Sequence, residues 1–422
     1  MNILMMTNTY LPHVGGVARS VDAFTNELRR LDNRVVVVAP EYEKDNKDET
    51  DVIRIPAVQH FNGSDFSAII PIPGFLEAHL RDFKPDIVHS HHPFLIGSTA
   101  VRVATKQRVP LVYTQHTMFE QYTHYVPIDV PRMKQFVVSL CTGYANMAEQ
   151  VIAPSNSIAD ILKKRGVKRP IETIPTGVFV KEFEQGDGDA VRASEHIPQQ
   201  AFVVGHVGRL APEKNLDFLS EAVALFLQDE PEAHFLIVGY GPSEKKMRDF
   251  FARQRQDRVH FLGKQYGQNL INAYHAMDVF AFSSKSETQG LVLTEAMAAG
   301  VPAVALDASG VRDVVQDKKN GYLLYDEQVD SFAKALKEMC HLSSQARESF
   351  IEEAKKTAEN FSMHNCASKI NTIYERLIKN HVPETHRDES VWSKSIEQVK
   401  TEWELLSNLT SAVGNALQEK KS

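Results

Sequence analysis

The chain has 422 residues, of which 43% are hydrophobic and 24% are charged, and its formal net charge is −7. This length favours two compact domains over one small module, and the composition is that of a folded chain rather than a disordered one. The excess of 54 acidic over 47 basic residues argues against a protein that binds nucleic acid through bulk positive charge.

The cysteines and the first residues indicate the compartment. Cys141, Cys340 and Cys366 are too few and too far apart to predict a disulfide framework or a zinc site, and they fit a reducing compartment. The first residues show no pattern of a signal peptide, and no window approaches the roughly 18 to 20 apolar residues of a membrane span. We therefore expect a cytoplasmic protein whose membrane role, if it has one, is peripheral.

Short β-branched runs alternate with segments of helical period, which predicts parallel sheets built from strand-helix units. The first strand is expected at residues 1–7, followed by a Pro/Gly loop at 11–16 and a helix that begins near residue 17. The other strands of this first series are expected at residues 34–39, 52–55, 86–89, 111–114, 150–153 and 171–174.

Residues 185–200 are acidic and rich in glycine, which predicts an interdomain linker between domains at 1–184 and 201–362. A return helix at 363–380 and a helical tail at 381–422 complete the expected organisation. The second series of strands is expected at residues 202–207, 235–238, 259–262, 279–282, 302–306 and 322–324. Two doubly wound α/β domains bind ligands at the carboxyl ends of their strands, so two of them facing one cleft suit a transfer enzyme with two substrates.

Two polar segments follow strands of the second series. Residues 208–215 (GRLAPEKN) place Arg209 and Lys214 at a strand-to-helix turn, where a guanidinium and an ammonium are suited to a diphosphate. The alternative is an exposed basic turn that forms ion pairs with Glu213. Residues 284–300 (SKSETQGLVLTEAMAAG) carry Glu287 in a loop and Glu295 in an apolar helix. The helix N-terminus is suited to a phosphate or sugar oxygen and Glu295 to a ligand hydroxyl; alternatively Glu287 caps the helix and Glu295 pairs with a neighbour.

These two segments together resemble the retaining glycosyltransferases of the GT-B architecture, family four of the sequence classification. Shorter matches support the resemblance, which covers about residues 1–380: they are Gly15-Gly16-Val17, Val88-His89-Ser90-His91, Ala153-Pro154-Ser155 and Ile237-Val238-Gly239-Tyr240-Gly241-Pro242. The resemblance implies two Rossmann-like domains, the first binding the acceptor and the second a nucleotide sugar. A catalytic metal or other cofactor is not required by it.

The resemblance also assigns roles to single residues. It implies that Arg209 and Lys214 bind the donor diphosphate, that Glu287 faces the donor sugar and that Glu295 takes the ribose hydroxyls. The remaining implied site residues are Gly16, whose backbone approaches the diphosphate, the phosphate-binding backbone of Gly290, Leu291 and Val292, and His116 at the sugar. The sequence offers no obvious carboxylate nucleophile of the kind that retaining glycosidases use. The resemblance implies front-face attack instead, with the leaving phosphate helping to deprotonate the acceptor.

Two other patterns suggest metal ligands. His89 and His91 fall on one face of an extended strand and His92 on the other, without a Cys or carboxylate to complete a ligand set, so we interpret them as cleft-lining or core histidines. Asp187 and Asp189 imitate the Asp-x-Asp motif of another glycosyltransferase architecture but lie in the expected linker. We predict no metal site from either pattern.

Within the family, the Glu-Thr-Gln-Gly loop at Gln289 and the segments HSHHPF and YTQHTMFEQYTHY resemble the bacterial diacylglycerol hexosyltransferases, of the 1,2-diacylglycerol 3-glucosyltransferase type. Residues 101–170 carry ten basic and four acidic residues, a balance suited to anionic headgroups. The expected acceptor and membrane residues are Phe119, Tyr122, Arg132 and Lys134. The resemblance implies UDP-glucose as donor, a lipid acceptor such as diacylglycerol, and peripheral association with the inner face of the cell membrane.

Several alternatives stay open from the sequence. The basic and aromatic region at 117–147 also fits a core helix with a solvated side. The acceptor also fits a soluble or carrier-linked sugar, and a sugar-nucleotide epimerase shares the two-domain architecture. The helical spacing of the apolar stripe in the tail, from Trp392 to Leu409, fits packing on the body, a coiled dimer or a membrane surface, and of these we favour packing on the body. It leaves the oligomeric state undecided.

Overall fold

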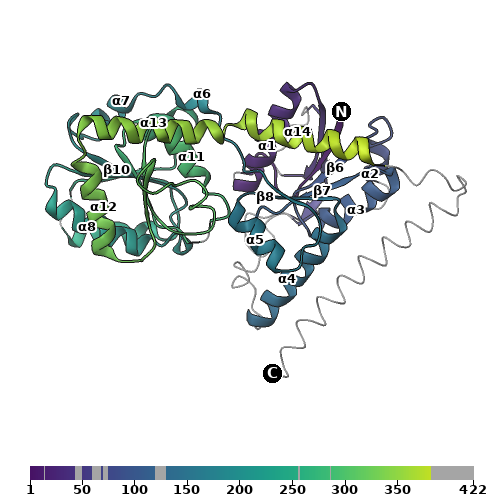
Figure 1. The fold of residues 1–422 in the computed structure, drawn as a ribbon, viewed down its shortest axis with the longest axis horizontal. Helices are drawn as coiled ribbons and strands as arrows, with labels where there is room; N and C mark the ends of the chain where they lie inside the picture. Colours follow the sequence, from purple (N-terminus) through teal and green to yellow (C-terminus); the bar gives the residue numbers. More distant parts are fainter. Residues whose placement is uncertain are drawn as a thin grey trace, which may run out of the picture. The chain divides into compact units, whose positions relative to one another are not determined.

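The computed structural model of the chain describes residues 1–13, 15–42, 50–58, 68–69, 75–118, 130–254, 257–285 and 287–381. The chain divides into two compact units (Figure 1). Unit 1 consists of Met1–Thr176 with Cys366–Ser422, and unit 2 of Gly177–Asn365.

Unit 1 is built on a parallel sheet whose described strands follow the order β3-β2-β1-β6-β7-β8-β9. Its strands are β1 (Asn2–Met6), β2 (Arg34–Pro40), β3 (Val52–Ile55), β6 (Ile87–Ser90), β7 (Leu111–Thr114), β8 (Gln150–Ala153) and β9 (Ile171–Thr173), with a separate pair formed by β4 (Ala57–Val58) and β5 (Ala68–Ile69). Its helices are α1 (Gly16–Arg30), α2 (Phe75–His79), α3 (Ile96–Gln107), α4 (Val130–Met147), α5 (Asn156–Lys164) and α14 (Met363–Asn380).

Unit 2 repeats this architecture with the strand order β12-β11-β10-β13-β14-β15. Its strands are β10 (Val203–Val207), β11 (His234–Val238), β12 (Val259–Gly263), β13 (Val279–Phe282), β14 (Ala303–Leu306) and β15 (Gly321–Leu324). Its helices are α6 (Val180–Phe183), α7 (Gly188–Ser194), α8 (Leu216–Asp229), α9 (Glu244–Arg253), α10 (Gly267–His275), α11 (Leu291–Ala298), α12 (Val329–Cys340) and α13 (Ser344–Asn360), with a 3-10 turn at Pro212–Lys214.

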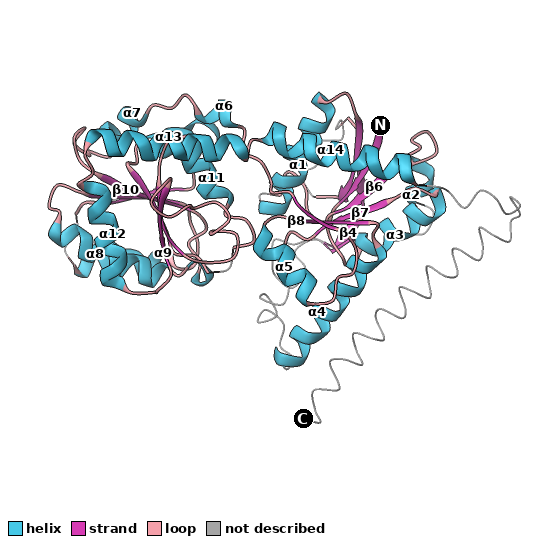
Figure 2. Cartoon of the chain, in the orientation of Figure 1, coloured by secondary structure: helices cyan, strands magenta, loops and turns pink. Residues whose placement is uncertain are grey.

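Both faces of the unit 2 sheet are covered by helices, with α7 and α13 on one side and α8 and α9 on the other (Figure 2). Successive residues of β10 belong to different cores, since Val203 packs with the α10, α11 and α13 side and Val204 with the α8, α9 and α12 side. Strands buried on both faces read as continuous apolar runs. Each strand of the two main sheets begins and ends within one residue of its sequence prediction, including β3, β9 and β12, which are only partly buried.

The segment expected to be a linker is instead part of unit 2. Residues 188–194 form α7, and Asp187 caps this helix by accepting a hydrogen bond from the Ala190 backbone N–H at 2.8 Å. The chain divides between Thr176 and Gly177 rather than at 185–200. The composition of this segment is that of a solvated linker, but the interactions that fold residues 188–194 as a helix come from residues far away in the sequence.

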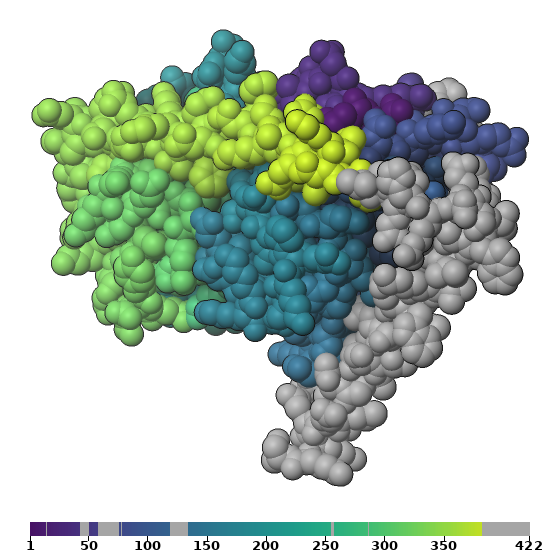
Figure 3. Space-filling view, turned by 45° about the vertical axis from the view of Figure 1, so that its right-hand side comes forward, coloured from purple at the N-terminus to yellow at the C-terminus, as the bar shows by residue number. Residues whose placement is uncertain are grey.

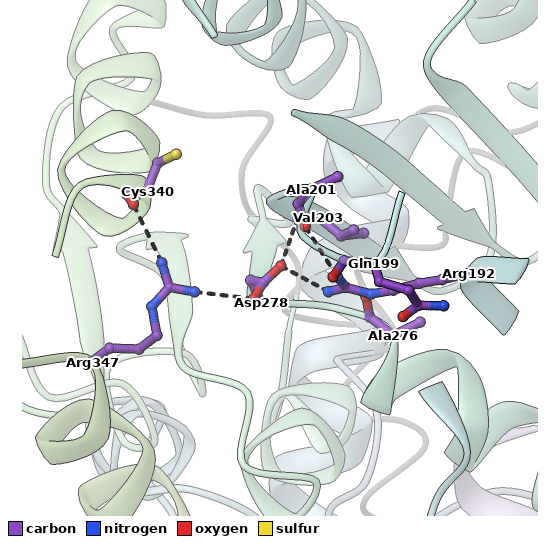
Figure 4. A network of polar contacts seen from close by, with 8 residues as sticks. All are labelled: Arg192, Gln199, Ala201, Val203, Ala276, Asp278, Cys340 and Arg347. Atoms are coloured by element: carbon purple, nitrogen blue, oxygen red, sulfur yellow. Dashed lines mark hydrogen bonds and ion pairs between the residues drawn. The ribbon is translucent and has the colours of Figure 1, made fainter. Parts of the chain in front are cut away.

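Arg192 of α7 provides most of those interactions (Figure 4). Its guanidinium donates to the carbonyls of Gln199, Ala201 and Ala276 at 2.8–3.0 Å and to the Asp278 carboxylate at 2.9 Å. The same carboxylate accepts from the Val203 backbone N–H at 2.8 Å and from Arg347 at 3.0 Å. This network fixes α7, α13 and the amino ends of β10 and β13 to one another.

Helix α14 spans the residues expected for the return helix, and from Cys366 onward the chain belongs to unit 1. Its yellow surface lies on unit 1 in Figure 3. Asn371 accepts a hydrogen bond from Asn33 at 2.8 Å, and Arg376 donates to Gln150 at 2.9 Å. Of the expected tail at 381–422, only His381 lies within the described residues.

Candidate functional site

The carboxyl ends of β10 and β13 bring two predicted site residues together. Lys214 closes the turn after β10, and Glu287 lies in the loop after β13, 73 positions away in the sequence. The Lys214 ammonium donates to Oε1 of Glu287, and these side chains are only 22% and 15% exposed. Glu287 therefore does not cap the following helix, and Lys214 does not pair with Glu213.

The turn that carries Lys214 is fixed from two sides. The buried Ser283 hydroxyl, at the end of β13, donates to the carbonyls of Lys214 and Asn215 at 2.9 and 3.1 Å. On the other side, the backbone N–H of Leu210 donates to the carbonyl of Tyr240 at 2.9 Å. Gly239, with φ of +137°, passes so close that a Cβ would lie 1.8 Å from the Gly208 carbonyl oxygen. A side chain at Gly239 would push apart the two loops at this edge of the sheet.

Arg209 lies in the same loop and differs from Lys214 in its surroundings. Its side chain is exposed, and within the described residues no ion-pair or hydrogen-bond partner engages it. Lys214 uses one of its three N–H groups to donate a hydrogen bond to Glu287. The loop thus places one exposed guanidinium and one paired ammonium at the strand ends, the type of groups that bind phosphate oxygens.

Helix α11 begins at the same edge, directly after Glu287. Gly290 is its N-cap, with φ of +76° and no side-chain capping bond, and Leu291 and Val292 form its half-buried first turn. Glu295, one turn further, is 2% exposed and accepts a hydrogen bond from the Tyr274 hydroxyl at 2.8 Å. The alternative in which Glu295 pairs with a neighbouring side chain is therefore confirmed, while its role toward ribose stays a prediction.

Two buried residues near Lys214 were missed by the sequence analysis. One is Ser283. The other is His206 in β10, which is 1% exposed and donates through Nδ1 to the Ala281 carbonyl at 3.1 Å. Burial lowers the pKa of His206 to about 4, and the positive charge of Lys214 contributes to the same direction. The sequence signals are slight: His206 is a polar residue inside an otherwise apolar strand, and Ser283 is the first polar residue after one.

In unit 1, the predicted histidines gather at the carboxyl ends of β6 and β7. His89 contacts the Tyr374 hydroxyl through Nδ1 at 2.5 Å and the Thr114 hydroxyl through Nε2 at 2.7 Å. The backbone N–H of Asn8 donates to Nδ1 of His92 at 3.1 Å. These two histidines are core residues held by protein partners rather than a set of metal ligands.

His91 and His116 form a pair of their own in this cluster. Nδ1 of His91 lies 2.9 Å from Nε2 of His116, and the His91 ring packs against His89 with centroids 4.1 Å apart. Burial lowers the pKa of His116 to about 4 and that of His91 well below its ordinary value. Both imidazoles are therefore neutral near pH 7 and carry one ring proton each.

The structure shows fewer contacts for the other predicted residues, Gly16 and the expected membrane residues. Gly16 opens α1, and a Cβ there would meet nothing within 4 Å, so the space beside this helix N-terminus is open within unit 1. Lys134 is exposed on α4; the Arg132 backbone belongs to the same helix, but its side chain, with Phe119 and Tyr122, lies outside the described residues. In the described part of the chain, none of the helices has the length and apolar character needed to cross a bilayer.

One group of side chains has the composition of a metal site. Among the described residues, Glu230, Cys340 and His341 bring three ligand atoms within 4.8 Å of one another. His341 already donates through Nε2 to Oε1 of Glu230 at 2.7 Å, and the Lys337 ammonium lies 3.9 Å from the same carboxylate. The group follows the C-terminal ends of α8 and α12, where Cys340 also contacts Arg347, and so lies away from Lys214.

Comparison with known proteins agrees with the two-unit fold. Residues 14–182 match the family described as Glycosyltransferase Family 4, and residues 187–357 match Glycosyl transferases group 1. Alpha-monoglucosyldiacylglycerol synthase of Acholeplasma laidlawii is 30% identical over 76% of this chain and 84% of its own length. The enzyme of the same name from Streptococcus pneumoniae is 28% identical over 86% and 83%. Other relatives of similar identity are named GDP-mannose-dependent alpha-mannosyltransferase and D-inositol 3-phosphate glycosyltransferase.

Among solved structures, that of the Anabaena protein HepE in complex with UDP resembles this chain with a TM-score of 0.70. The sequences are 21% identical, and the match covers 89% of this chain and all of the other. A match at this identity supports the fold. Together with the curated relatives and the two family matches, it shows that the chain belongs to the GT4 family of GT-B glycosyltransferases.

Proposed function

We propose that this glycosyltransferase moves glucose, with retention of configuration, from UDP-glucose to a lipid acceptor such as diacylglycerol at an anionic membrane surface. The donor site of this proposal is the edge of unit 2 that carries Lys214, Glu287 and Arg209. The observation that carries it is the Lys214–Glu287 ion pair at the carboxyl ends of β10 and β13, the edge at which doubly wound sheets bind their ligands.

The ion pair suits a site in which a cation lies between two anions. Lys214 donates a hydrogen bond to Glu287 through one N–H group. In the proposal, its other two N–H groups donate to the donor diphosphate. Arg209 adds a planar guanidinium, and the α11 N-terminus at Gly290, Leu291 and Val292 adds backbone N–H groups. Glu287, held in place by Lys214, then accepts hydrogen bonds from hydroxyls of the sugar.

Two further residues have proposed roles toward the donor. Glu295 receives the ribose hydroxyls, with Tyr274 holding one of its oxygens in place. Gly16 lets the backbone at the start of α1 approach the diphosphate, since a side chain there would fill space that is open within unit 1. The ribose is thus recognised by a different residue from those that stabilise the leaving diphosphate.

In the proposed front-face reaction, the bond between the anomeric carbon and the phosphate oxygen breaks while the acceptor oxygen bonds to the same face. The acceptor hydroxyl loses its proton to the leaving phosphate. Arg209, Lys214 and the α11 N-terminus stabilise the negative charge that grows on the diphosphate. His116 hydrogen-bonds the sugar during transfer. No carboxylate nucleophile takes part, and the reaction as written requires no metal.

The lipid acceptor is supported by the names of relatives and by unit 1. Two of the relatives are alpha-monoglucosyldiacylglycerol synthases. Residues 101–170 carry a clear excess of basic residues, and α4 combines exposed Lys134 with half-buried Phe136, Val137 and Val138. A basic helix with partly exposed apolar side chains suits the surface of an anionic membrane. The protein would then act at the inner face of the cell membrane.

A soluble acceptor is the second candidate, and the name of one relative, D-inositol 3-phosphate glycosyltransferase, favours it. Relatives at a similar level of identity are named for GDP-mannose and for inositol phosphate. Donor and acceptor therefore have to be tested independently. A sugar-nucleotide epimerase, the third possibility raised by the sequence, would convert the nucleotide sugar without any acceptor.

A transfer screen separates these possibilities. UDP-glucose and GDP-mannose are each incubated with the protein and with diacylglycerol in vesicles, with soluble inositol phosphate, or with no acceptor, and the products are resolved by mass. We expect glucosyl diacylglycerol with an α-anomeric linkage by NMR, and sedimentation with anionic vesicles that weakens as salt is raised. Transfer only to the soluble acceptor, or an absence of vesicle binding at low salt, would contradict the lipid acceptor.

A further inference from the structure

A single hydrogen bond joins His91 to His116. Nδ1 of His91 lies 2.9 Å from Nε2 of His116, and the ring centroids are 5.2 Å apart. His91 is only 2% exposed, whereas His116 is half-buried. A hydrogen bond between two ring nitrogens contains one proton, so one imidazole donates and the other accepts.

Two arrangements of the ring protons are compatible with this contact, because burial keeps both imidazoles neutral. In the first, His91 donates through Nδ1–H, and the proton of His116 is on its Nδ1. In the second, His116 donates through Nε2–H, and the proton of His91 is on its Nε2. The two arrangements differ in which nitrogen of His116 is the donor and in whether the far nitrogen of His91, Nε2, carries a proton.

The far nitrogen of His91 distinguishes the two arrangements. Within the described residues, Nε2 of His91 is buried and has no hydrogen-bond partner. The second arrangement would leave a buried N–H there without an acceptor, which folded proteins rarely tolerate. The first leaves only a bare acceptor nitrogen, which is tolerated more often. The His91 ring packs against His89, which Tyr374 and Thr114 hold on both of its ring nitrogens.

We propose that His91 is a positioning residue that holds His116 in its Nδ1–H tautomer. Nε2 of His116 then accepts from His91, and Nδ1–H is the donor that His116 presents. This inference rests on the proposed transfer reaction for its functional meaning: His116 donates a hydrogen bond to an oxygen of the transferred sugar. With its lone pair engaged by His91, it does not act as a general base on the acceptor hydroxyl.

The tautomer is measured directly by NMR on the full-length protein labelled with nitrogen-15 histidine. Long-range nitrogen–proton correlation spectra distinguish a ring protonated at Nδ1 from one protonated at Nε2. The signals of His116 are identified as those lost in His116→Ala. We expect the Nδ1–H pattern for His116 in the wild-type protein and an Nε2–H or mixed pattern in His91→Leu. The Nε2–H pattern in the wild type would overturn the proposal.

Two variants test the consequence for transfer. His91→Leu removes the donor, and His91→Asn keeps an N–H donor near the position of Nδ1. We expect His91→Leu to lower kcat about tenfold, the effect of losing one hydrogen bond, with the KM for the nucleotide sugar nearly unchanged. His91→Asn should recover most of the loss, and His91→Leu should have no further effect in a His116→Ala background. An unchanged kcat in a folded His91→Leu protein would contradict the proposal.

A matched control comes from a second pair of histidines in unit 2. Nδ1 of His234 lies 2.9 Å from Nε2 of His260, at the amino end of β11 and away from the donor site. His234→Leu should leave kcat and the spectrum of His116 unchanged. If His116→Ala itself transfers sugar at the wild-type rate, the proposed role of His116 fails, while the wild-type spectrum still decides whether His91 sets the tautomer.

Discussion

Strands β10 and β13 of unit 2 carry charged side chains at both of their ends. At the amino ends, Asp278 accepts hydrogen bonds from Arg192, Arg347 and the Val203 backbone, and Arg192 also binds three backbone carbonyls. At the carboxyl ends, Lys214 pairs with Glu287, and Arg209 is exposed without a partner in the described part of the chain.

The two groups of side chains differ in how many of their hydrogen-bond donors and acceptors are paired within the protein. The Arg192 network uses its hydrogen-bonding capacity within the protein, as expected of buried charges that hold a fold together. The Lys214 group leaves positive hydrogen-bonding capacity unused at a ligand-binding edge, which favours an anionic ligand. Substitution should therefore reduce stability at the amino ends and transfer at the carboxyl ends.

The largest expected effect is on catalysis. Lys214→Ala should lower the rate of sugar transfer by about 10²- to 10³-fold, because it removes a charge that stabilises the leaving diphosphate. The unfolding midpoint should change little. Lys285→Ala is the matched control, since Lys285 also pairs with a glutamate, Glu327, but at a more exposed position. Steady-state transfer rates check both variants, and a near wild-type rate for Lys214→Ala would contradict the charge-stabilising role.

The next largest effect is on stability. Arg192→Met should lower the free energy of unfolding by about 3 kcal/mol, because it leaves buried carbonyls and part of the Asp278 carboxylate without donors. Arg347 is more exposed, and Arg347→Met should cost only about 1 kcal/mol. Urea unfolding monitored by circular dichroism measures both. Equal losses for the two variants would show that Arg192 is not the centre of this network.

A smaller effect is expected at Glu295. Tyr274→Phe removes the hydroxyl that donates to this buried carboxylate, and the free energy of unfolding should fall by about 1–2 kcal/mol. Urea unfolding measures this loss of stability. Tyr266→Phe is the control, because Tyr266 is an exposed tyrosine directly before α10, the helix that contains Tyr274. No change in Tyr274→Phe relative to the control would mean that Glu295 does not depend on this hydrogen bond.

The smallest expected effect is the change of kcat with pH. Burial lowers the pKa of His116 to about 4, so His116 is neutral throughout the range from about pH 6 to 8. An imidazole with the ordinary pKa of 6.5 would be about three-quarters protonated at pH 6. We therefore expect kcat to change less than about twofold over this range. A fall of about fourfold toward pH 6 that disappears in His116→Gln would show that His116 titrates normally.

Most of the strands could be predicted from the sequence because they are buried on both faces and read as short apolar runs. The segment around Arg192 could not, since its acidic, glycine-rich composition is that of a linker. Its partners Ala276 and Asp278 lie more than 80 positions away. Composition over a short window contains no information about such distant contacts.

The candidate site could likewise be predicted only in part. Lys214 and Glu287 could each be identified from motifs that follow strands, but their ion pair depends on β10 and β13 being neighbours in the sheet. The support from Ser283 and the buried His206 was missed for the same reason. The pairing of His91 with His116 depends on the adjacency of β6 and β7 and on the orientation of the two rings, which the sequence does not reveal.

The most direct test of the donor site is calorimetric titration of UDP and of GDP into the wild-type protein, Lys214→Ala and Lys285→Ala. If the Lys214–Glu287 pair forms the diphosphate site, the wild type and Lys285→Ala should bind one of these nucleotides with equal affinity. Lys214→Ala should bind it at least about tenfold more weakly, the loss expected for a charge-assisted hydrogen bond. Equal affinity of all three proteins would contradict the assignment of this edge of unit 2 as the donor site.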